Sequence, residues 1–316
     1  MTPPPFVSVI IAAHDAAFFV QKAIDSALAQ SGAHIEVIVV DDASTDDTRS
    51  VIHSLAAQND AIVPISSPTN LGPGGARNLA LARAKGDWIA VLDSDDSFAP
   101  DRLANMVHAA KRADADIVID DFVSMRPDGE ILEEPSLSDR RSAGAITLAD
   151  WVGLNVMERG ELSFGYAKPL ISREFLVKSG VTYNAALRNG EDFHLVLASL
   201  IAGAKLHFTA MPGYHYTRRA GSVSARARHD HLRALLDADD VAGRQLDANA
   251  QAVALRFLAR RRKNIERLMT TESIMGDLKA KRFGGAVAQL LRHPATTGRL
   301  IGHLAEAVGK RIGANQ

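Results

Sequence analysis

Three carboxylates follow an apolar run in the stretch WIAVLDSDDSF, which covers residues 88–98. Asp93, Asp95 and Asp96 come after apolar residues that leave no polar face, so a buried strand is predicted before them. Unpaired anions at the end of such a strand repel one another and are costly to desolvate. A divalent cation with a phosphorylated ligand would neutralise them, since Mg²⁺ binds through one or two carboxylates plus substrate phosphates. The alternative is a solvated turn in which Asp93 caps the next helix.

Polar residues stand at equivalent places after two earlier apolar segments. His14 and Asp15 follow the segment 6–13, and Asp42 closes the next one. In an open parallel sheet the carboxyl ends of the strands meet at one edge, and ligands bind there. These side chains are therefore expected to share one site with the three carboxylates. For Asp42 the alternative is a cap for the helical segment after Ser44.

The first 120 residues alternate apolar, β-branched segments with segments whose apolar residues recur at helical spacing. Strands are predicted at 6–13, 36–40, 61–65, 88–92 and 116–119, and helices at 19–30, 47–57, 75–85 and 101–112. This alternation predicts an α/β fold, a Rossmann-like and mostly parallel sheet with helices on both faces. No G-x-G-x-x-G follows the first strand, which argues against a dinucleotide-binding unit.

Beyond residue 120 the pattern changes. The sequence predicts a hairpin or turn in MRPDGEIL, a mobile loop in EEPSLSDRRSAG, helices at 148–157, 173–179 and 192–202, and a short strand at 205–209. From about residue 229 the chain is predicted to be helical, with breaks at Gly284-Gly285 and Pro294. We therefore expect an α/β domain at 1–225 and a basic helical appendage at 226–316.

The composition is that of an ordinary globular protein. The chain has 316 residues, of which 47% are hydrophobic and 23% charged, and its formal net charge is −1. It contains no cysteine, which excludes disulfide and thiolate chemistry and agrees with a reducing compartment. The N-terminus has no basic n-region, and the longest apolar stretch, 195–204, is about half of a membrane span. A cytoplasmic protein is expected.

The near-zero net charge conceals an asymmetry. Residues 251–316 hold thirteen Lys and Arg against four Asp and Glu, a balance of +9, whereas the first 250 residues hold 23 against 33, a balance of −10. A basic region on an acidic body suggests an anionic partner. Helical spacing near the C-terminus predicts an apolar stripe made of Ile301, Leu304, Val308 and Ile312.

A basic amphipathic helix of this kind can lie in an anionic membrane interface, at the cytoplasmic face of the inner membrane. The alternative is that the stripe packs on the protein itself or on a second subunit in a homodimer. Nothing in the sequence supplies a base-reading element, so no nucleic-acid partner is expected.

Six segments occur together in the order and spacing of family 2 glycosyltransferases with the A-type (GT-A) fold. They are VSVIIAAHD, EVIVVDDASTDDT, NLGPGGARNLAL, WIAVLDSDDSF, RNGEDFHL and YHYTRRAGSVS. Within that family the chain resembles bacterial enzymes that extend exopolysaccharide or lipid-linked saccharide repeats. The resemblance covers roughly residues 5–225 and depends on the six motifs together, whereas the C-terminal helices fall outside it.

The resemblance assigns a nucleoside site to the loops after the first two strands. It implies that Asp42 contacts uracil, with Ala12, His14 and Asp15 on the neighbouring strand end and loop. The residues suit this role, because Asp42 ends its strand with a hydroxyl-rich loop behind it and can accept hydrogen bonds from a base or ribose.

The resemblance also assigns the diphosphate and its metal. In the D-x-D motif Asp95 ligates Mn²⁺ or Mg²⁺, and Asp93 joins it as a metal residue that lies nearer the ribose. Asp96 is expected to face the acceptor or to support the metal ligands, with a helix cap near Pro100 as its alternative. Arg77 follows a glycine-rich turn whose helix N–H groups can face phosphate, with a surface salt bridge as the alternative.

The remaining motifs supply a base and a lid. By resemblance Asp192 deprotonates the acceptor hydroxyl, and Glu191 beside it would raise the pKa of that carboxylate. Favourable acidity in the first turn of a helix is the alternative for this pair. Arg218 and Arg219 lie on a loop that could fold over the sugar diphosphate. The same segment contributes Ser222 and Ser224, together with Tyr214 and Tyr216 as candidates for stacking on an acceptor sugar.

The predicted activity is inverting transfer of a hexose, with glucose expected, from a UDP-sugar to a saccharide acceptor. A polyprenyl diphosphate is one carrier that such an acceptor could have. The first alternative is a sugar-nucleotide nucleotidyltransferase, but the loop after the first strand lacks the Gly and Lys typical of those enzymes. The second is a non-catalytic module that binds sugar nucleotides, which the complete set of motif carboxylates argues against. Lys168 precedes the base motif, and the sequence assigns it no chemical role.

Overall fold

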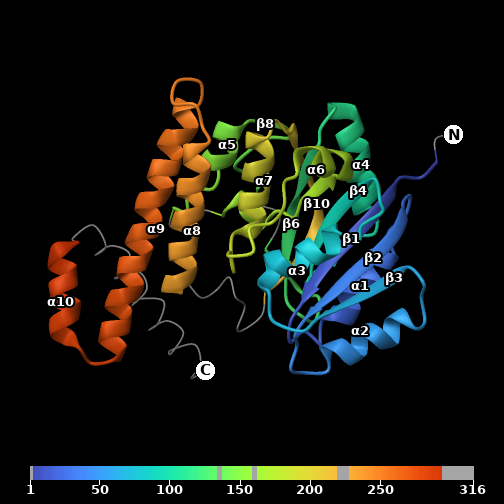
Figure 1. Cartoon of the computed structure of the whole chain (residues 1–316), viewed down its shortest axis with the longest axis horizontal. Coiled ribbons are helices and arrows are strands. Elements are labelled where there is room, and N and C mark those ends of the chain that lie inside the picture. Colours follow the sequence, from blue (N-terminus) through green and yellow to red (C-terminus); the bar gives the residue numbers. More distant parts are fainter. Residues whose placement is uncertain (1–2, 134–136, 159–161, 219–227, 294–316) are drawn as a thin grey trace. The chain divides into compact units, whose positions relative to one another are not determined.

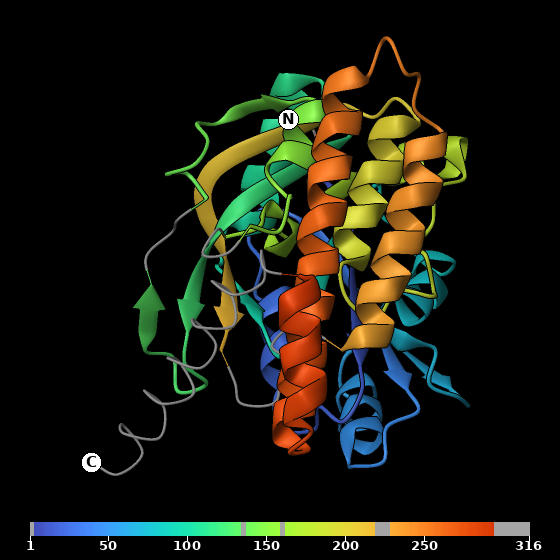
Figure 2. The same cartoon turned by 90° about the vertical axis from the view of Figure 1, so that its left-hand side faces the viewer.

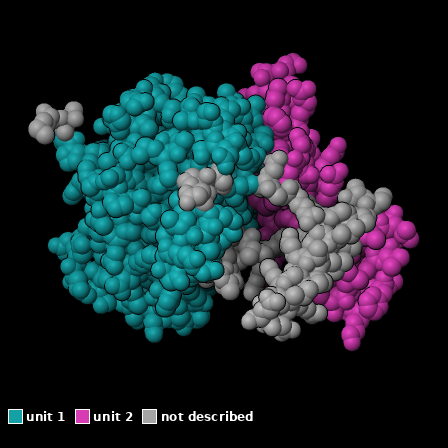
Figure 3. Space-filling model, turned by 180° about the vertical axis from the view of Figure 1, so that it is seen from behind, with its two compact units in different colours: residues 1–155, 162–222 teal, residues 156–161, 223–316 magenta. Residues whose placement is uncertain are grey.

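The computed structural model describes residues 3–133, 137–158, 162–218 and 228–293 (Figures 1 and 2). Its contacts divide the chain into two compact units, which Figure 3 colours separately. Unit 1 takes residues 1–155 and 162–222, and unit 2 takes residues 156–161 and 223–316. The predicted boundary between residues 225 and 226 lies outside the described residues.

Unit 1 is built on a single sheet. Its strands in the described part of the chain are β1 (Phe6–Ala13), β2 (His34–Asp42), β3 (Ile62–Ser67), β4 (Trp88–Asp93), β5 (Ser97–Phe98), β6 (Ile117–Met125), β7 (Ile131–Glu133), β8 (Gly144–Ile146), β9 (Leu170–Ser172) and β10 (Leu206–Thr217). Their order is β3-β2-β1-β4-β9-β6-β10-β5, with β7 beside β6 and β8 beside β10. The strands from β3 to β4 pair in parallel, as do β6 and β10, whereas β9 is antiparallel to both neighbours. The predicted α/β sheet is confirmed.

Helices cover both faces of this sheet. In unit 1 they are α1 (Val20–Leu28), α2 (Thr48–Ala56), α3 (Gly72–Leu81), α4 (Arg102–Ala113), α5 (Leu148–Gly153), the 3₁₀ turn η1 (Phe164–Tyr166), α6 (Arg173–Ser179) and α7 (Glu191–Ile201). α1 and α2 contact each other beside β2 and β3. The chain then crosses back from β3 to β4, and α3 in this connection packs on β1 and β2. Because crossovers between parallel strands are right-handed as a rule, the reversed direction puts α3 on the face opposite α1 and α2.

The parallel strands are buried on both sides, as their runs of β-branched residues indicate. Val9, Ile10 and Ile11 of β1 and Val37 to Val40 of β2 are fully buried. Such strands have no polar face, because helices exclude water from both sides of the sheet. The helix predicted at 75–85 begins earlier, at Gly72, since Pro73 suits the first turn.

β10 is much longer than the strand predicted at 205–209. It runs beside β6 as far as Thr217 and is seen in Figure 2 as a long curved strand. Its register shifts on either side of Pro212, and this irregularity interrupts the alternation that would have revealed the strand. The segment expected to be a loop from Tyr214 onward is therefore strand as far as residue 217.

Unit 2 is helical in its described residues, with α8 (His229–Arg244), α9 (Ala252–Lys279) and α10 (Phe283–Arg292). α8 and α9 enclose an ion pair in which Arg261 Nε lies 3.0 Å from Asp239 Oδ2. The predicted break at Gly284-Gly285 is wrong, because both glycines lie in the first turn of α10. The chain breaks instead just before Phe283, where Lys281 has a φ of +58°.

One face of α10 packs on α9 and the other is exposed. Ala286 is buried against Ile274 of α9. Phe283, Val287 and Leu291, which are four residues apart on the helix, are 61%, 57% and 78% exposed. No helix among the described residues is long and apolar enough to cross a membrane.

Candidate active site

The carboxyl ends of neighbouring parallel strands bring the predicted site residues to one edge of the sheet. There Ala12 of β1 pairs with Asp93 of β4, and Ala13 pairs with Asp41 of β2. Because β1 lies between β2 and β4, the loop after β1 is flanked by Asp42 on one side and Asp93 on the other. The acidic cluster and the two loops therefore belong to one site, as the sheet geometry predicts.

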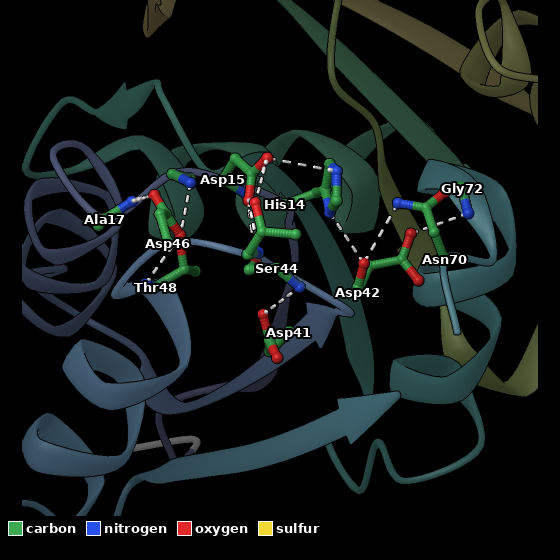
Figure 4. A network of polar contacts seen from close by, with 12 residues as sticks. His14, Asp15, Ala17, Asp41, Asp42, Ser44, Asp46, Thr48, Asn70 and Gly72 are labelled. Atoms are coloured by element: carbon green, nitrogen blue, oxygen red, sulfur yellow. Dashed lines mark hydrogen bonds and ion pairs between the residues drawn. The ribbon is translucent and has the colours of Figure 1, made fainter. Parts of the chain in front are cut away.

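The loop after β1 is held to the loop after β2 by hydrogen bonds (Figure 4). His14 Nδ1 lies 3.0 Å from the carbonyl oxygen of Asp42, and the Thr45 N–H donates to Asp15 Oδ1 at 2.7 Å. Asp15 has a φ of +48°, a conformation that Asp tolerates better than most residues. The hydrogen bond from Thr45 holds the pKa of Asp15 below its ordinary value. His14 and Asp15 are thus fixed side by side, with half-exposed side chains.

Asp42 fastens the start of α3. Its carboxylate is buried and accepts hydrogen bonds from the N–H of Leu71 at 2.7 Å and of Gly72 at 2.8 Å (Figure 4). Gly72 has a φ of +78°, so any other residue would be strained there, and its Cβ would also displace the Arg188 side chain, whose Nη1 lies 2.5 Å away. The alternative in which Asp42 caps the helix after Ser44 is wrong.

The acidic cluster fits a divalent cation. Asp93, Asp95 and Asp96 can each place a carboxylate oxygen within 4.8 Å of the others, and oxygen ligands are those that Mg²⁺ and Mn²⁺ prefer. Asp96 is buried, and its oxygens accept from the Tyr214 hydroxyl at 2.6 Å and the Thr217 N–H at 2.7 Å. Asp96 therefore ties the end of β4 to β10, and the alternative of a helix cap is wrong.

Tyr214 belongs to the core of unit 1. It is fully buried, and its hydroxyl also accepts from the N–H of Asp93 at 3.2 Å. Burial, followed by the charges of Asp96 and Asp93, raises the pKa of Tyr214. The expectation that Tyr214 stacks on an acceptor sugar is wrong for this reason. Tyr216 is partly exposed and lies against the rings of Phe122 and Tyr166.

Arg77 of α3 binds three carboxylates at once. Its Nη2 lies 2.5 Å from Asp93 Oδ1, and its Nη1 lies 2.6 Å from Glu191 Oε1 and 3.2 Å from Asp192 Oδ1. The guanidinium also stands over the Tyr183 ring, 5.4 Å from its centroid. Only 3% of the Arg77 side chain is exposed, so the alternative of a surface salt bridge is wrong.

A second cation completes the arrangement. Lys168 Nζ lies 2.8 Å from Asp93 Oδ2 and 2.7 Å from Asp192 Oδ2, and the Tyr183 hydroxyl donates to Asp192 Oδ1 at 2.9 Å. The sequence offers one weak signal for Lys168, because GYAKPLISREF resembles the family's stretch before the base motif, where a basic residue is usual. We refer to five residues as the buried ion network: Arg77, Lys168, Asp93, Glu191 and Asp192.

The network sets the protonation of its members. Burial alone would raise the pKa of Asp93, but Lys168 and Arg77 outweigh it and hold that pKa below its ordinary value. Burial alone would lower the pKa of Lys168, but Asp192 and Asp93 raise it above the ordinary range, so Lys168 stays cationic. Burial, and then the charge of Asp192, raises the pKa of Glu191. The repulsion expected between the two neighbouring carboxylates thus acts on Glu191.

The predicted lid is described only in part. Arg218 follows the end of β10, where its half-exposed guanidinium pairs with Glu133 of β7. Arg219, Ser222 and Ser224 lie outside the described residues. The role of this segment over a diphosphate therefore stays a prediction.

Solved structures define the class of the fold. The chain is similar to TarS residues 1–349 of S. aureus, solved with UDP-GlcNAc, with a TM-score of 0.66 and 20% identity over 83% of this chain and 75% of that one. It is also similar to the mannosyltransferase PcManGT of Pyrobaculum calidifontis, solved with GDP-Man and Mn²⁺. That match has a TM-score of 0.61 and 19% identity over 96% of this chain and 81% of the other. The fold is the A-type glycosyltransferase fold.

Sequence relatives define the family. The family model described as glycosyl transferase family 2 matches residues 8–156. The succinoglycan biosynthesis protein ExoO of Rhizobium meliloti is 34% identical over 99% of this chain and 89% of its own length. The glucosyltransferase WfaP of Escherichia coli is 30% identical over 72% of this chain and 83% of its own length. The chain belongs to glycosyltransferase family 2.

Proposed function

We propose that the chain transfers glucose from UDP-glucose to a saccharide acceptor, with inversion at the anomeric carbon, in the biosynthesis of exopolysaccharide or another cell-surface polysaccharide. The observation that carries the proposal has two parts. The loops after β1 and β2 share one sheet edge with the acidic cluster, and Arg77 and Lys168 join Asp93 of that cluster to the buried carboxylate of Asp192. The names of relatives support the polysaccharide class. The E. coli relative is named for UDP-Glc as donor and for an acceptor linked to diphosphoundecaprenol.

The uridine is proposed to lie over the loops after β1 and β2. Ala12, at the end of β1, presents a small side chain there, and His14 and Asp15 border the same space. Asp42 can serve both the protein and the base. Each carboxylate oxygen accepts more than one hydrogen bond, so Asp42 can hold α3 and still accept from a uracil N–H.

The diphosphate is proposed to lie by the acidic cluster, where Asp95 and Asp93 would hold Mn²⁺ or Mg²⁺. When bound, such a cation neutralises the negative charge that develops on a departing diphosphate. Arg218 and Arg219 would bind the same diphosphate from the segment after β10. Arg77 contributes to the diphosphate site indirectly, because its ion pair fixes the orientation of Asp93.

Asp192 is proposed to accept the proton of the acceptor hydroxyl. Its Oδ1 accepts from Arg77 and Tyr183, whereas its Oδ2 accepts, among the described residues, from Lys168 alone. Oδ2 therefore has a lone pair available for the acceptor. The acceptor O–H bond breaks as its proton moves to Asp192, and the acceptor oxygen bonds to the anomeric carbon. The bond from that carbon to the diphosphate breaks, and its electron pair leaves with UDP.

The activity is tested with UDP-glucose, Mn²⁺ and a panel of saccharides, free or linked to polyprenyl diphosphate. UDP release measures turnover, and proton NMR of the product is expected to show a β-glucoside. An α-glucoside would contradict inversion. Pyrophosphate formation from UTP and glucose 1-phosphate would favour a nucleotidyltransferase, and UDP-glucose binding without transfer or hydrolysis would favour a non-catalytic module.

Two variants separate the donor role from the base role. Asp95→Ala is expected to lose Mn²⁺-dependent UDP binding in calorimetry while it keeps a cooperative melt. Asp192→Asn is expected to keep that binding and to lower turnover at least about a hundredfold, the usual contribution of a general base. Asp60→Ala, at an exposed residue outside the site, is the control and should change neither quantity. Unchanged metal-dependent UDP affinity in Asp95→Ala would remove Asp95 from the site.

We also propose that the chain works at an anionic membrane surface, the cytoplasmic face of the inner membrane, where a lipid-linked acceptor would be found. The stripe predicted at 301–312 lies outside the described residues, but α10 offers a comparable surface. Phe283, Val287 and Leu291 are exposed on one face, and residues 278–293 contain four Lys and Arg and no Asp or Glu. Of these four cations, Arg282 pairs with Asp277 of α9. Such a helix suits the interface of an anionic bilayer.

Two arginines of α9 are less available for this purpose. Arg260 pairs with Glu158, and Arg262 pairs with Asp240 and Glu266. We therefore expect α10 to contribute more to membrane binding than α9.

Sedimentation with phosphatidylglycerol liposomes tests the membrane proposal. The full chain is expected to bind at low salt and to dissociate as salt screens the charges. The triple change Phe283→Ser, Val287→Ser and Leu291→Ser should weaken binding, whereas Val177→Ser, at an exposed apolar residue of α6, should not. If the parent does not sediment with liposomes at low salt, membrane binding is contradicted. The apolar face of α10 would then be expected to be buried by self-association, in a homodimer.

A further inference from the structure

Lys168 contacts both sides of the proposed reaction with a single atom. Its Nζ lies 2.8 Å from Asp93 Oδ2 and 2.7 Å from Asp192 Oδ2. Asp93 belongs to the acidic cluster on the donor side, and Asp192 is the proposed proton acceptor. We propose that Lys168 is a positioning residue that fixes the distance between these carboxylates and so sets the acceptor hydroxyl against the donor. This inference rests on the proposed function.

The backbone that carries Lys168 is fixed at the residue's own carbonyl group and at that of the next residue. Arg102 Nη2 donates to the Lys168 carbonyl oxygen at 2.6 Å, and the N–H of Val91 donates to the Pro169 carbonyl oxygen at 3.2 Å. Pro169 has a restricted φ and also restricts the residue before it. The ammonium is therefore presented from a rigid segment, and that segment is bonded to β4, the strand that ends in Asp93.

Arg102, which donates to the Lys168 carbonyl, is itself held by buried contacts. It is 2% exposed, and its Nε and Nη2 donate to the two oxygens of Asp120 at 2.8 and 2.7 Å. Its guanidinium stands 4.5 Å from the centroid of the Phe98 ring. A bidentate, buried pair of this kind fixes direction as well as distance. The support of Lys168 thus reaches β6 through Asp120.

Lys168 and Arg77 act on different oxygens of Asp192. Arg77 donates to Oδ1 and Lys168 to Oδ2, and Arg77 also contacts Glu191. Without Lys168, Arg77 would be the remaining cation in contact with the three carboxylates among the described residues. Their repulsion would then move Asp192 away from Asp93. A displacement of about 1 Å among reacting groups can cost about a hundredfold in rate. The loss should therefore appear in kcat.

The test uses Lys168→Met in the full chain, because methionine keeps an apolar side chain of similar length without the charge. With UDP-glucose and Mn²⁺, kcat is expected to fall at least about tenfold, measured as UDP release with acceptor and with water alone. The Kd for UDP with Mn²⁺, from calorimetry, should stay near that of the parent. Lys168→Arg should be faster than Lys168→Met but slower than the parent, since arginine keeps the positive charge on a side chain of different length and shape.

The matched control is Lys178→Met, which removes an exposed lysine paired with Glu174 and should change neither kcat nor Kd. Two results would overturn the proposal. A higher Kd for UDP with unchanged kcat would make Lys168 a donor-binding residue. A lower melting temperature with unchanged kcat would make its role purely structural. Lys168→Gln supplies a second variant if the methionine variant does not melt cooperatively.

A double variant shows whether Lys168 acts through Asp192. Lys168→Met combined with Asp192→Asn is expected to be no slower than Asp192→Asn alone, because the carboxylate to be positioned is gone. Rate losses that multiply would contradict the positioning role. If Asp192→Asn alone leaves turnover unchanged, the base assignment of the proposed function fails, and this outcome is read separately from the effect of Lys168→Met.

Discussion

The loops after β1 and β2 and the buried ion network are held together by different forces. In the loops after β1 and β2, short side chains bond to backbone N–H groups, as when Thr48 Oγ1 accepts from Ala16 at 2.7 Å. The side chains that face outward there, His14 and Asp15, are 44% and 45% exposed. In the network, two cations meet three carboxylates, and only Asp93, at 25%, exposes more than a tenth of its side chain.

This difference indicates in which region the loss of one contact costs more free energy of unfolding. A hydrogen bond contributes about 1 kcal/mol, whereas removal of one partner from a buried ion pair costs about 3–5 kcal/mol because a charge is left uncompensated. The loops can therefore adjust to a nucleotide at small cost. The network, by contrast, fixes the distances between the groups that are proposed to react.

The largest effect is expected from Arg77→Met. Among the described cations, this change leaves Lys168 as the partner of Asp93 and Asp192, and it removes the ion pair between Arg77 and Glu191. Stability in urea unfolding is expected to fall by roughly 3–5 kcal/mol. The matched control is Arg126→Met, which removes a half-exposed pair with Glu130 and should cost less than about 1 kcal/mol. Equal losses in the two variants would break the contrast between network and surface.

The sequence predicts the loops better than the network, and the reason is physical. The loop residues directly follow apolar strands, and parallel strands bring their carboxyl ends together by rule. The network joins side chains from four separate segments, and its contacts depend on how α3, β4 and α7 pack. Motif resemblance identified Arg77 and Asp192 one by one, but it could not show that Lys168 stands between Asp93 and Asp192.

Two errors in the predicted secondary structure have a similar origin. Gly284 and Gly285 are predicted to break a helix, but they lie in the first turn of α10. The N–H groups of a first turn have no acceptor within the helix, so no interior hydrogen bond of the helix depends on them. Pro212 and Gly213 concealed the second half of β10, because a register shift there removes the alternation of apolar residues. In both cases tertiary pairing overrides the local preference of glycine and proline.

The next effect in size is expected from Asp42→Asn. The amide group of asparagine has one accepting oxygen, so the N–H of either Leu71 or Gly72 loses its partner. A loss of about 1–3 kcal/mol in unfolding free energy is expected. Affinity for UDP should fall as well. Unchanged stability would mean that the Asp42 carboxylate is not needed to hold α3. Both of its oxygens would then be available to accept hydrogen bonds from the nucleotide.

A smaller effect is expected from Thr48→Val, which keeps the shape of the side chain and removes its hydroxyl. The Ala16 N–H then loses its acceptor, at a cost of about 1 kcal/mol in urea unfolding. Thr45→Val is the control, because the Thr45 hydroxyl makes an exposed contact of 3.2 Å with Asp15 and should contribute less. A loss as large as that of Arg77→Met would show that the loops are as rigid as the network.

The smallest effect is on the pH dependence of stability, and its sign differs between the two regions. The pKa of Asp15 is lowered, chiefly by the Thr45 hydrogen bond, so its contribution is present above the ordinary value of 3.8 and is lost as pH falls through the lowered pKa. The pKa of Glu191 is raised, first by burial and then by Asp192. The folded protein therefore binds more protons at Glu191 than the unfolded chain does, and stability falls as pH rises from 4.5 through the raised pKa.

Urea unfolding of Asp15→Asn should flatten the acid side of the profile of stability against pH, and that of Glu191→Gln should flatten the region above pH 4.5. The same change of slope in both variants would show that the two regions do not differ in their electrostatics.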